Sequence, residues 1–375
     1  MKLDKNKLNT IGVDRIKLYV ELISVNTEIN VDIYSVATDK AKMYYRVYDE
    51  ATGTYINLSG LNYRKVITGE NVTSDGKDNV SYGLDMSNRS KVVLDVVLPR
   101  VVYGTIHNVY NVIDREVIIE SMECIVEELK AEGIEINDPE EWEVYSMEVN
   151  KTIIADKPLI SYREGILWLL DNAFLKGYTK EDNDYKKRLS DNSISNTYYY
   201  GTKRINKKIY DKTGQIKDNL NIYIKENLIR SELTYNKEAI NKTFKSIYLY
   251  DVLNKEKIEK SYNKATAELG DYLNEFTEEA ITNLEAQFTK ANFKEIDRVY
   301  KENAKRLFDI VFLVEAARKV YKGYGNNKFS RDIKKLLKCY DNSLYGKYRE
   351  LYNILIAFNS SIEATNFYTL NKKFF

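Results

Sequence analysis

Apolar side chains alternate with polar ones in several short segments of the first two thirds of the chain. In residues 14–21, Ile16, Leu18 and Val20 fall at every second position, which is the period of a β-strand. Pro99 is expected to end the strand predicted at residues 92–98, because proline cannot donate a hydrogen bond to a neighbouring strand. Alternation or a short continuous apolar run predicts further strands at residues 43–48, 92–98, 144–150, 197–202, 207–211 and 228–235.

Helical spacing replaces this alternation at two places between the strands. Residues 114–131 and 162–175 carry their apolar side chains on one helical face, and Gly133 is expected to end the first helix. The polar stretch at 71–91 predicts a loop or hairpin, and the one at 176–196 predicts an exposed loop.

Beyond about residue 246 the strand patterns disappear and helical periodicity continues. It predicts helices at residues 262–276, 278–288, 293–324 and 330–339. We therefore expect an α+β fold in which an antiparallel sheet with flanking helices occupies residues 1–245. A mostly α-helical C-terminal domain is expected at residues 246–375.

Composition excludes several classes of protein. Apolar residues make up 43% of the chain, enough for a sizeable core, and no stretch approaches the ~20 apolar residues of a membrane helix. The first residues are charged and lack the apolar segment of a signal peptide. Cys124 and Cys339 are the two cysteines, which excludes a disulfide scaffold or a cysteine zinc site and favours a reducing cytoplasm. We expect no membrane partner.

The chain has one histidine, His107, and a net charge of +1. A single histidine excludes sites that need a histidine pair, so any metal must be held mainly by carboxylates. Carboxylates favour hard ions, here Mg²⁺ or Mn²⁺. A near-neutral chain has no general attraction for nucleic acid, so any such contact must come from local clusters of basic residues.

Three predicted strands each carry an acidic residue near the middle, namely Asp95, Glu148 and Glu232. A carboxylate inside an apolar strand is costly to bury unless it is paired, hydrogen-bonded or bound to metal. If these strands are neighbours in one sheet, the three carboxylates converge on a patch that needs a cation. The alternative is that each acid faces water or pairs with an arginine.

Residues 197–212 combine basic and aromatic side chains. Cations that meet phosphates and rings on which bases stack are what single-stranded DNA binding requires. The alternative is an exposed hairpin with solvated lysines. The abundance of tyrosine, at 32 residues, is no evidence for chemistry by itself. The basic residues are Lys203, Arg204, Lys207, Lys208 and Lys212, and the tyrosines are Tyr198, Tyr199, Tyr200 and Tyr210.

With these residues in place, the chain resembles the nickase core of rolling-circle plasmid replication initiators and the gene II replication proteins of filamentous phages. The resemblance covers about residues 90–245. It is carried by Tyr200-Gly201, Ile209-Tyr210-Asp211-Lys212, Arg230-Ser231-Glu232, Glu148, the Asp95, Pro99 and Arg100 segment, and His107-Asn108-Val109. Two positions depart from the usual pattern, with Ser146 in place of an arginine and Asp95 in place of a glutamate.

The resemblance implies a nickase in which Tyr210 attacks the scissile phosphate and remains joined to the 5′ end, leaving a 3′-hydroxyl primer. It implies Mg²⁺ or Mn²⁺ held by Asp95, Glu148 and Glu232. Lys212 is expected on the same strand and face as Tyr210, where it stabilises the phenolate or the phosphate. His107 either completes the metal site or is structural. DNA contacts are expected from Lys203, Arg204, Lys207, Lys208 and Arg230.

The partners implied are origin DNA, double- and single-stranded, together with a host helicase and a second copy of the chain. Residues 246–375 would then recognise the origin or mediate self-association. Two other functions remain open: a conjugative relaxase with the same chemistry, and a DNA-binding protein without nicking activity whose acidic residues are structural.

Overall fold

The structure is a computed structural model that describes residues 3–25, 46–49, 54–57, 80–85, 91–103, 107–131, 134–174, 197–201, 204–290, 296–303, 311–320 and 347–359. The chain divides into two compact units. The first comprises Met1–Ile154 and Tyr199–Tyr262, and the second comprises Ala155–Tyr198 and Asn263–Phe375.

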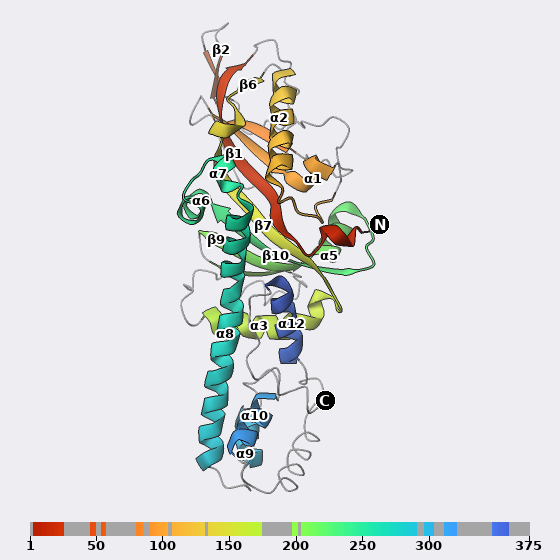
Figure 1. The fold of residues 1–375 in the computed structure, drawn as a ribbon, viewed down its shortest axis with the longest axis vertical. Coiled ribbons are helices and arrows are strands. Elements are labelled where there is room, and N and C mark those ends of the chain that lie inside the picture. Colours follow the sequence, from red (N-terminus) through yellow and green to blue (C-terminus); the bar gives the residue numbers. More distant parts are fainter. Residues whose placement is uncertain are drawn as a thin grey trace. The chain divides into compact units, whose positions relative to one another are not determined.

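An antiparallel sheet is the framework of the first unit (Figure 1). Within the described residues its order is β4-β5-β1-β7-β10-β9-β8, and β6 pairs with the far end of β1. A separate pair, β2 and β3, is also antiparallel. The strands are β1 (Ile11–Val25), β2 (Arg46–Asp49), β3 (Thr54–Asn57), β4 (Val80–Asp85), β5 (Lys91–Val97), β6 (Ile134–Ile136), β7 (Glu143–Ala155), β8 (Thr197–Gly201), β9 (Ile205–Asp211) and β10 (Asn227–Asn236).

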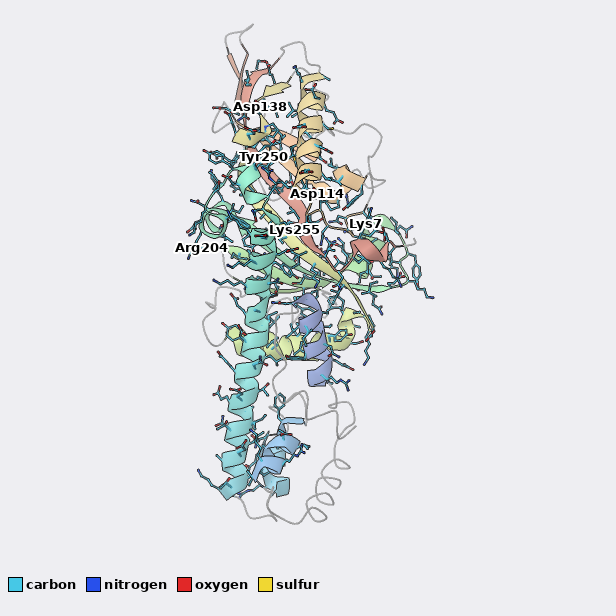
Figure 2. All side chains as sticks on the ribbon, viewed as in Figure 1. Lys7, Asp114, Asp138, Arg204, Tyr250 and Lys255 are labelled. Atoms are coloured by element: carbon cyan, nitrogen blue, oxygen red, sulfur yellow. The ribbon has the colours of Figure 1, made fainter. Side chains whose placement is uncertain are left out.

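Helices and short 3-10 turns join these strands. Asp114 lies at the start of α2 (Figure 2). Its carboxylate accepts hydrogen bonds from the backbone nitrogens of Glu116 and Val117. The elements associated with the first unit are η1 (Lys5–Lys7), α1 (Leu98–Tyr103), α2 (Arg115–Ala131), η2 (Pro139–Glu141), α5 (Lys212–Leu220), α6 (Lys237–Phe244), α7 (Leu249–Val252) and the start of α8 (Lys255–Lys290).

The central strands have one apolar and one polar face. Ile16 and Leu18 of β1 are fully buried, as are Leu94 and Val96 of β5, and the apolar side chains on one face of α2 are buried as well. On the other face of β1, Arg15 is only partly buried. Alternation keeps the side chains of this face out of the apolar core. The candidate site described below lies on this polar face.

The described residues of the second unit are helical apart from its share of β7 and β8. Within it, α12 packs on α3, with Leu351 and Leu355 of α12 and Leu169 of α3 buried. Among the described helices, none has the length and apolarity that crossing a bilayer requires. The helices are η3 (Leu159–Tyr162), α3 (Arg163–Phe174), the rest of α8, α9 (Ile296–Asn303), α10 (Val311–Val320) and α12 (Lys347–Phe358).

The predicted α+β fold is confirmed, and most element predictions agree within a few residues. The helix at 114–131 and the strand at 228–235 are examples. Pro99 does end its strand, but it stands near the start of α1, where a missing N–H costs nothing. The two helices predicted at 262–276 and 278–288 are a single helix, α8. Gly133, the loop at 176–196 and the helix at 330–339 lie outside the described residues.

Candidate active site

Asp14 reaches the polar face through an irregularity in β1. The register with β7 shifts there, since Val13 pairs with Val149 and Arg15 pairs with Glu148, which leaves Asp14 as an extra residue. Such a β-bulge redirects a side chain away from strict alternation. Without it, Asp14 would share the apolar face of the strand. The bulge therefore explains how a carboxylate that is only 2% exposed comes to lie beside Glu148.

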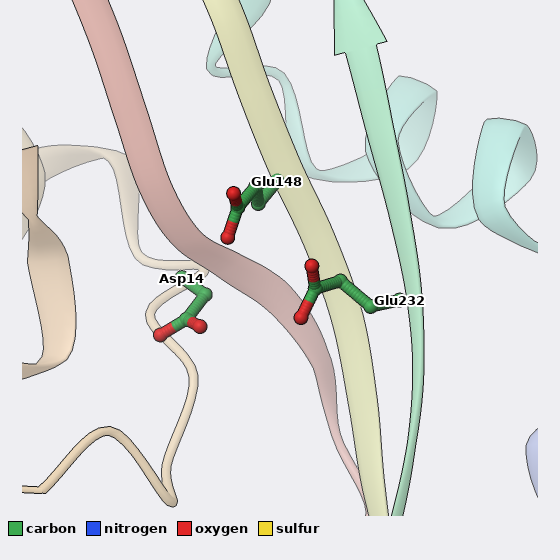
Figure 3. Close-up of side chains that lie close together, drawn as sticks. All are labelled: Asp14, Glu148 and Glu232. Carbon is green, nitrogen blue, oxygen red and sulfur yellow. The ribbon is translucent and has the colours of Figure 1, made fainter. Parts of the chain in front are cut away.

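The carboxylates of Asp14, Glu148 and Glu232 converge from three neighbouring strands, β1, β7 and β10 (Figure 3). One oxygen from each lies within 4.8 Å of the other two. Burial raises the pKa of Glu148 to about 7, and the negative charges of Glu232 and Asp14 add to the shift. Each negative charge disfavours ionisation of the next carboxyl, so a cation among the three oxygens would stabilise their ionised forms.

This cluster suits a hard divalent cation. Carboxylate oxygens are the donors that Mg²⁺ and Mn²⁺ prefer. Oδ1 of Asp14 is buried and accepts no hydrogen bond from any described residue. An oxygen in that position gains a partner only when a cation or water reaches it, so Asp14, Glu148 and Glu232 fit a metal site.

The raised pKa of Glu148 predicts how the metal-free protein responds to pH. Its folded pKa of about 7 lies above the ordinary value of 4.5, so its stabilising contribution is complete below pH 4.5 and is lost as pH rises through 7. Glu148→Gln stays neutral, so with a chelator present it should melt at a higher temperature than the wild type near pH ~8 and at a similar one near pH ~4.5. Thermal unfolding at several pH values measures this, and parallel curves for the two proteins would contradict it.

Arg230 is a buried cation that orients Asp14. Its side chain is 0% exposed, and it donates to Oδ2 of Asp14 at 2.9 Å and to Oγ1 of Thr152 at 2.8 Å. It also donates to the carbonyl oxygens of Val109, at 2.9 Å, and Asn108. The sequence suggests a DNA contact for Arg230, but a fully buried guanidinium that bonds to protein acceptors is not presented to a phosphate. Arg230 is instead part of the support of the cluster.

Tyr210 lies directly against this cluster. It stands opposite Arg230 in the register of β9 and β10, and its hydroxyl donates to Oε2 of Glu232 at 3.0 Å. The ring is 5% exposed. Burial and the charge of Glu232 raise the pKa of Tyr210 well above 10, so the phenol holds its proton at neutral pH.

Two lysines flank the ring of Tyr210. The ammonium of Lys208 pairs with Oε1 of Glu232 at 2.5 Å and lies 5.3 Å from the ring centroid. The ammonium of Lys212 lies 5.7 Å from the same centroid and is held by Oδ1 of Asn108 and Oε1 of Gln215, each at 2.8 Å. Burial, together with the charge of Arg230, lowers the pKa of Lys212 well below its ordinary value.

The expected position of Lys212 needs a correction. It is not in the strand of Tyr210, because β9 ends at Asp211 and Lys212 is the first residue of α5. Asp211 caps this helix by accepting a hydrogen bond from the nitrogen of Gly214 at 2.9 Å. The ammonium of Lys212 nevertheless lies near the ring of Tyr210, as expected, although Lys212 belongs to a helix and not to the strand.

Asp95 was expected to be a metal ligand, and its surroundings differ from that expectation more than those of Glu148 or Glu232. It forms two hydrogen bonds of 2.6 Å with Arg15, and Lys17 lies 3.5 Å from it. The cluster contains Asp14 in its place. Strand β1 separates β5 from β7, so Asp95 is one strand further from Glu148 than expected. Asp95 therefore matches the alternative of pairing with an arginine, although it lines the cavity that also contains the three clustered carboxylates.

His107 is buried and close to cations. Its Nδ1 accepts from the nitrogen of Val109 at 3.4 Å, and its ring meets that of Tyr110 edge to face. Burial, with the charges of Lys212 and Arg100, lowers the pKa of His107 to about 4, so it is neutral at physiological pH. The carboxylate cluster does not include it, and these contacts favour the structural alternative.

The other basic residues expected at DNA are not equivalent. Arg204 is exposed and pairs with Glu238 at 2.6 Å. Lys207 is 3% exposed, with its ammonium 5.8 Å from the ring centroid of Tyr200, so it faces the interior. Lys203 lies outside the described residues. Lys208, by contrast, pairs with Glu232 of the cluster.

A cavity of about 410 Å³ lies over the cluster. It is lined by all three carboxylates and Tyr210, by Arg15, and by polar side chains of α5 such as Gln215. Four residues of the site were not predicted from the sequence: Asp14, Arg15, Gln215 and Asn108, whose carboxamide accepts from Lys212. Asp14 carried one usable signal, since it occupies a position that alternation assigns to the apolar face of β1.

Comparisons with known proteins give little further. No protein-family model matches the chain, and no curated protein matches it. Among solved structures, it is similar to the rolling circle replication initiator protein from Geobacillus stearothermophilus, at 12% sequence identity and a TM-score of 0.29, over 62% of this chain and 77% of that one. A likeness this low assigns no family, so the function has to be argued from the geometry of the site.

Proposed function

We propose that this chain is a rolling-circle DNA replication initiator, a metal-dependent enzyme that nicks one strand at an origin through Tyr210 and later rejoins it. The observation that carries the proposal is the hydrogen bond of 3.0 Å from the Tyr210 hydroxyl to Glu232, one of three clustered carboxylates. This contact supports the roles of nucleophile for Tyr210 and proton acceptor for Glu232, beside a candidate metal site in the same cavity.

The nicking step follows from these contacts. The Tyr210 oxygen attacks phosphorus, the bond between phosphorus and the 3′ oxygen breaks, and the tyrosyl proton passes to Oε2 of Glu232. The 3′ oxygen takes a proton from water, and the 5′ phosphate remains on Tyr210. The 3′-hydroxyl then primes synthesis, and rejoining reverses the step.

Charge stabilisation of the non-bridging phosphate oxygens is the chemistry that a divalent cation held by Asp14, Glu148 and Glu232 supplies. Lys208 and Lys212 flank the ring of Tyr210 and favour its phenolate over the phenol. Their positions also suit contacts to the phosphate that Tyr210 attacks. Arg204, exposed beyond the site, suits a contact to the backbone of the same strand. Residues 246–375 are proposed to serve origin recognition or self-association.

The test is nicking of supercoiled plasmid that carries the origin. With Mn²⁺ we expect an open circle bearing covalently attached protein, visible as a band shift that protease removes. Chelation of the metal should abolish both. Tight binding of the origin without any nick or adduct, over a range of Mn²⁺ concentrations, would favour the non-catalytic DNA-binding protein and contradict the proposal.

Asp14 and Asp95 provide a matched pair for the metal site. Asp14→Asn removes a clustered carboxylate, so we expect nicking to fall at least ~100-fold. Asp95→Asn breaks an ion pair at the margin of the cavity, so we expect less than a ~10-fold effect. Initial nicking rates across a Mn²⁺ titration measure both. A larger loss for Asp95→Asn than for Asp14→Asn would return the ligand role to Asp95.

A further inference from the structure

Asn108 connects the two halves of the site. Its Nδ2 donates to Oδ2 of Asp14 at 2.8 Å, and its Oδ1 accepts from the ammonium of Lys212 at 2.8 Å. Only one orientation of the carboxamide satisfies both neighbours, because the reverse would set an NH₂ group against an ammonium and an oxygen against a carboxylate. The side chain of Asn108 therefore bridges a carboxylate and an ammonium, donating to Asp14 and accepting from Lys212.

The backbone around Asn108 is held in place. Its carbonyl oxygen and that of Val109 accept hydrogen bonds from Arg230. Val109 and Tyr110 are buried in an apolar cluster with Leu8 near the N-terminus and Ile216 of α5. A carboxamide on such a fixed segment is suited to orienting its partners.

The effect on Asp14 is specific. Oδ2 of Asp14 receives hydrogen bonds from both Asn108 and Arg230, whereas Oδ1 receives none from the described residues. The two donors fix the rotation of the carboxylate and leave its other oxygen for a cation. Supporting hydrogen bonds of this kind hold metal-binding carboxylates in their binding geometry.

We propose that Asn108 is a positioning residue that orients Asp14 for metal binding and ties it to Lys212 beside Tyr210. This inference rests on the metal site of the proposed function. Asn111 offers a matched comparison, because it is a buried asparagine of the same segment. Its Nδ2 donates to the carbonyl oxygens of Thr10 and Asn150, each at 2.9 Å, and these two acceptors are uncharged.

The test is direct Mn²⁺ binding to the full chain without DNA, by electron paramagnetic resonance of the free ion. Asn108→Leu should weaken Mn²⁺ binding ~10–100-fold, whereas Asn111→Leu should stay within ~2-fold of the wild type. Asn108→Ala carries the same expectation and replaces Asn108→Leu if the larger side chain prevents folding. Wild-type affinity in the Asn108 variants, or an equal loss in Asn111→Leu, overturns the proposal.

A second measurement separates this inference from the proposed function. Nicking by Asn108→Leu at saturating Mn²⁺ should remain slower than that of the wild type, because Lys212 has lost one of its two acceptors. A wild-type chain that binds Mn²⁺ but does not nick DNA overturns the proposed function and leaves the role of Asn108 in metal binding intact. A wild-type chain that does not bind Mn²⁺ overturns both.

Discussion

Tyr210→Phe should form no covalent adduct with origin DNA and should nick at least ~1000-fold more slowly than the wild type. The substitution removes one oxygen, which is the proposed attacking atom, and leaves the ring between Lys208 and Lys212. That oxygen donates a buried hydrogen bond to the carboxylate of Glu232 and also interacts with Arg230, so the free energy of unfolding should fall by about 1.5–3 kcal/mol. Adduct formation on denaturing gels and thermal unfolding measure the two effects.

Neighbouring tyrosines supply the controls for this experiment. Tyr198 and Tyr200 of β8 are 4% and 5% exposed, and Tyr199 between them is half-buried. We expect Tyr199→Phe to keep forming the adduct. An adduct that persists in Tyr210→Phe and disappears when Tyr198, Tyr199 or Tyr200 is replaced by Phe would move the nucleophile to β8 and remove the role proposed for Glu232 as proton acceptor.

How much of this site can be predicted from the sequence depends on which strands are neighbours in the sheet. Glu148 and Glu232 were identified as acids at mid-strand, and the structure brings them together because β7 and β10 are neighbours. Asp95 was identified on the same grounds, but β1 separates its strand from β7. Neighbour order in a sheet arises from long-range pairing, and the alternation of a single strand carries no information about it.

Asp14 shows the second limit. Alternation assigns it to the apolar face with Ile16, and only the shift in pairing between Val13 and Arg15 moves it to the polar face. A bulge is a property of two strands together, so the pattern of β1 alone does not reveal it. The same holds for Lys207 and Arg230, whose charge suggested DNA contact and whose burial was set by packing. The periodicity of apolar residues predicted the helices and strands, whereas the roles of these side chains could be assigned only from the tertiary structure.

Arg230→Leu should destabilise the first unit by about 3–5 kcal/mol, the cost expected when one partner of a buried ion pair is removed. The guanidinium bonds to Asp14, Thr152 and two carbonyl oxygens, all of which would lose a donor in a buried setting. Arg230→Lys should recover only part of the loss, because an ammonium cannot reproduce the planar fork that reaches these acceptors together. Urea unfolding without metal measures both variants.

Arg204→Leu is the control, since its pair with Glu238 is exposed on both sides and should contribute less than ~1 kcal/mol. A double-mutant cycle then identifies what Arg230 compensates. If its main task is to balance the buried charge of Asp14, Asp14→Asn should restore much of the stability lost in Arg230→Leu, with a coupling of ~1–3 kcal/mol. Strictly additive effects would mean that Arg230 acts through Thr152 and the Asn108 segment, and that Asp14 is held chiefly by Asn108.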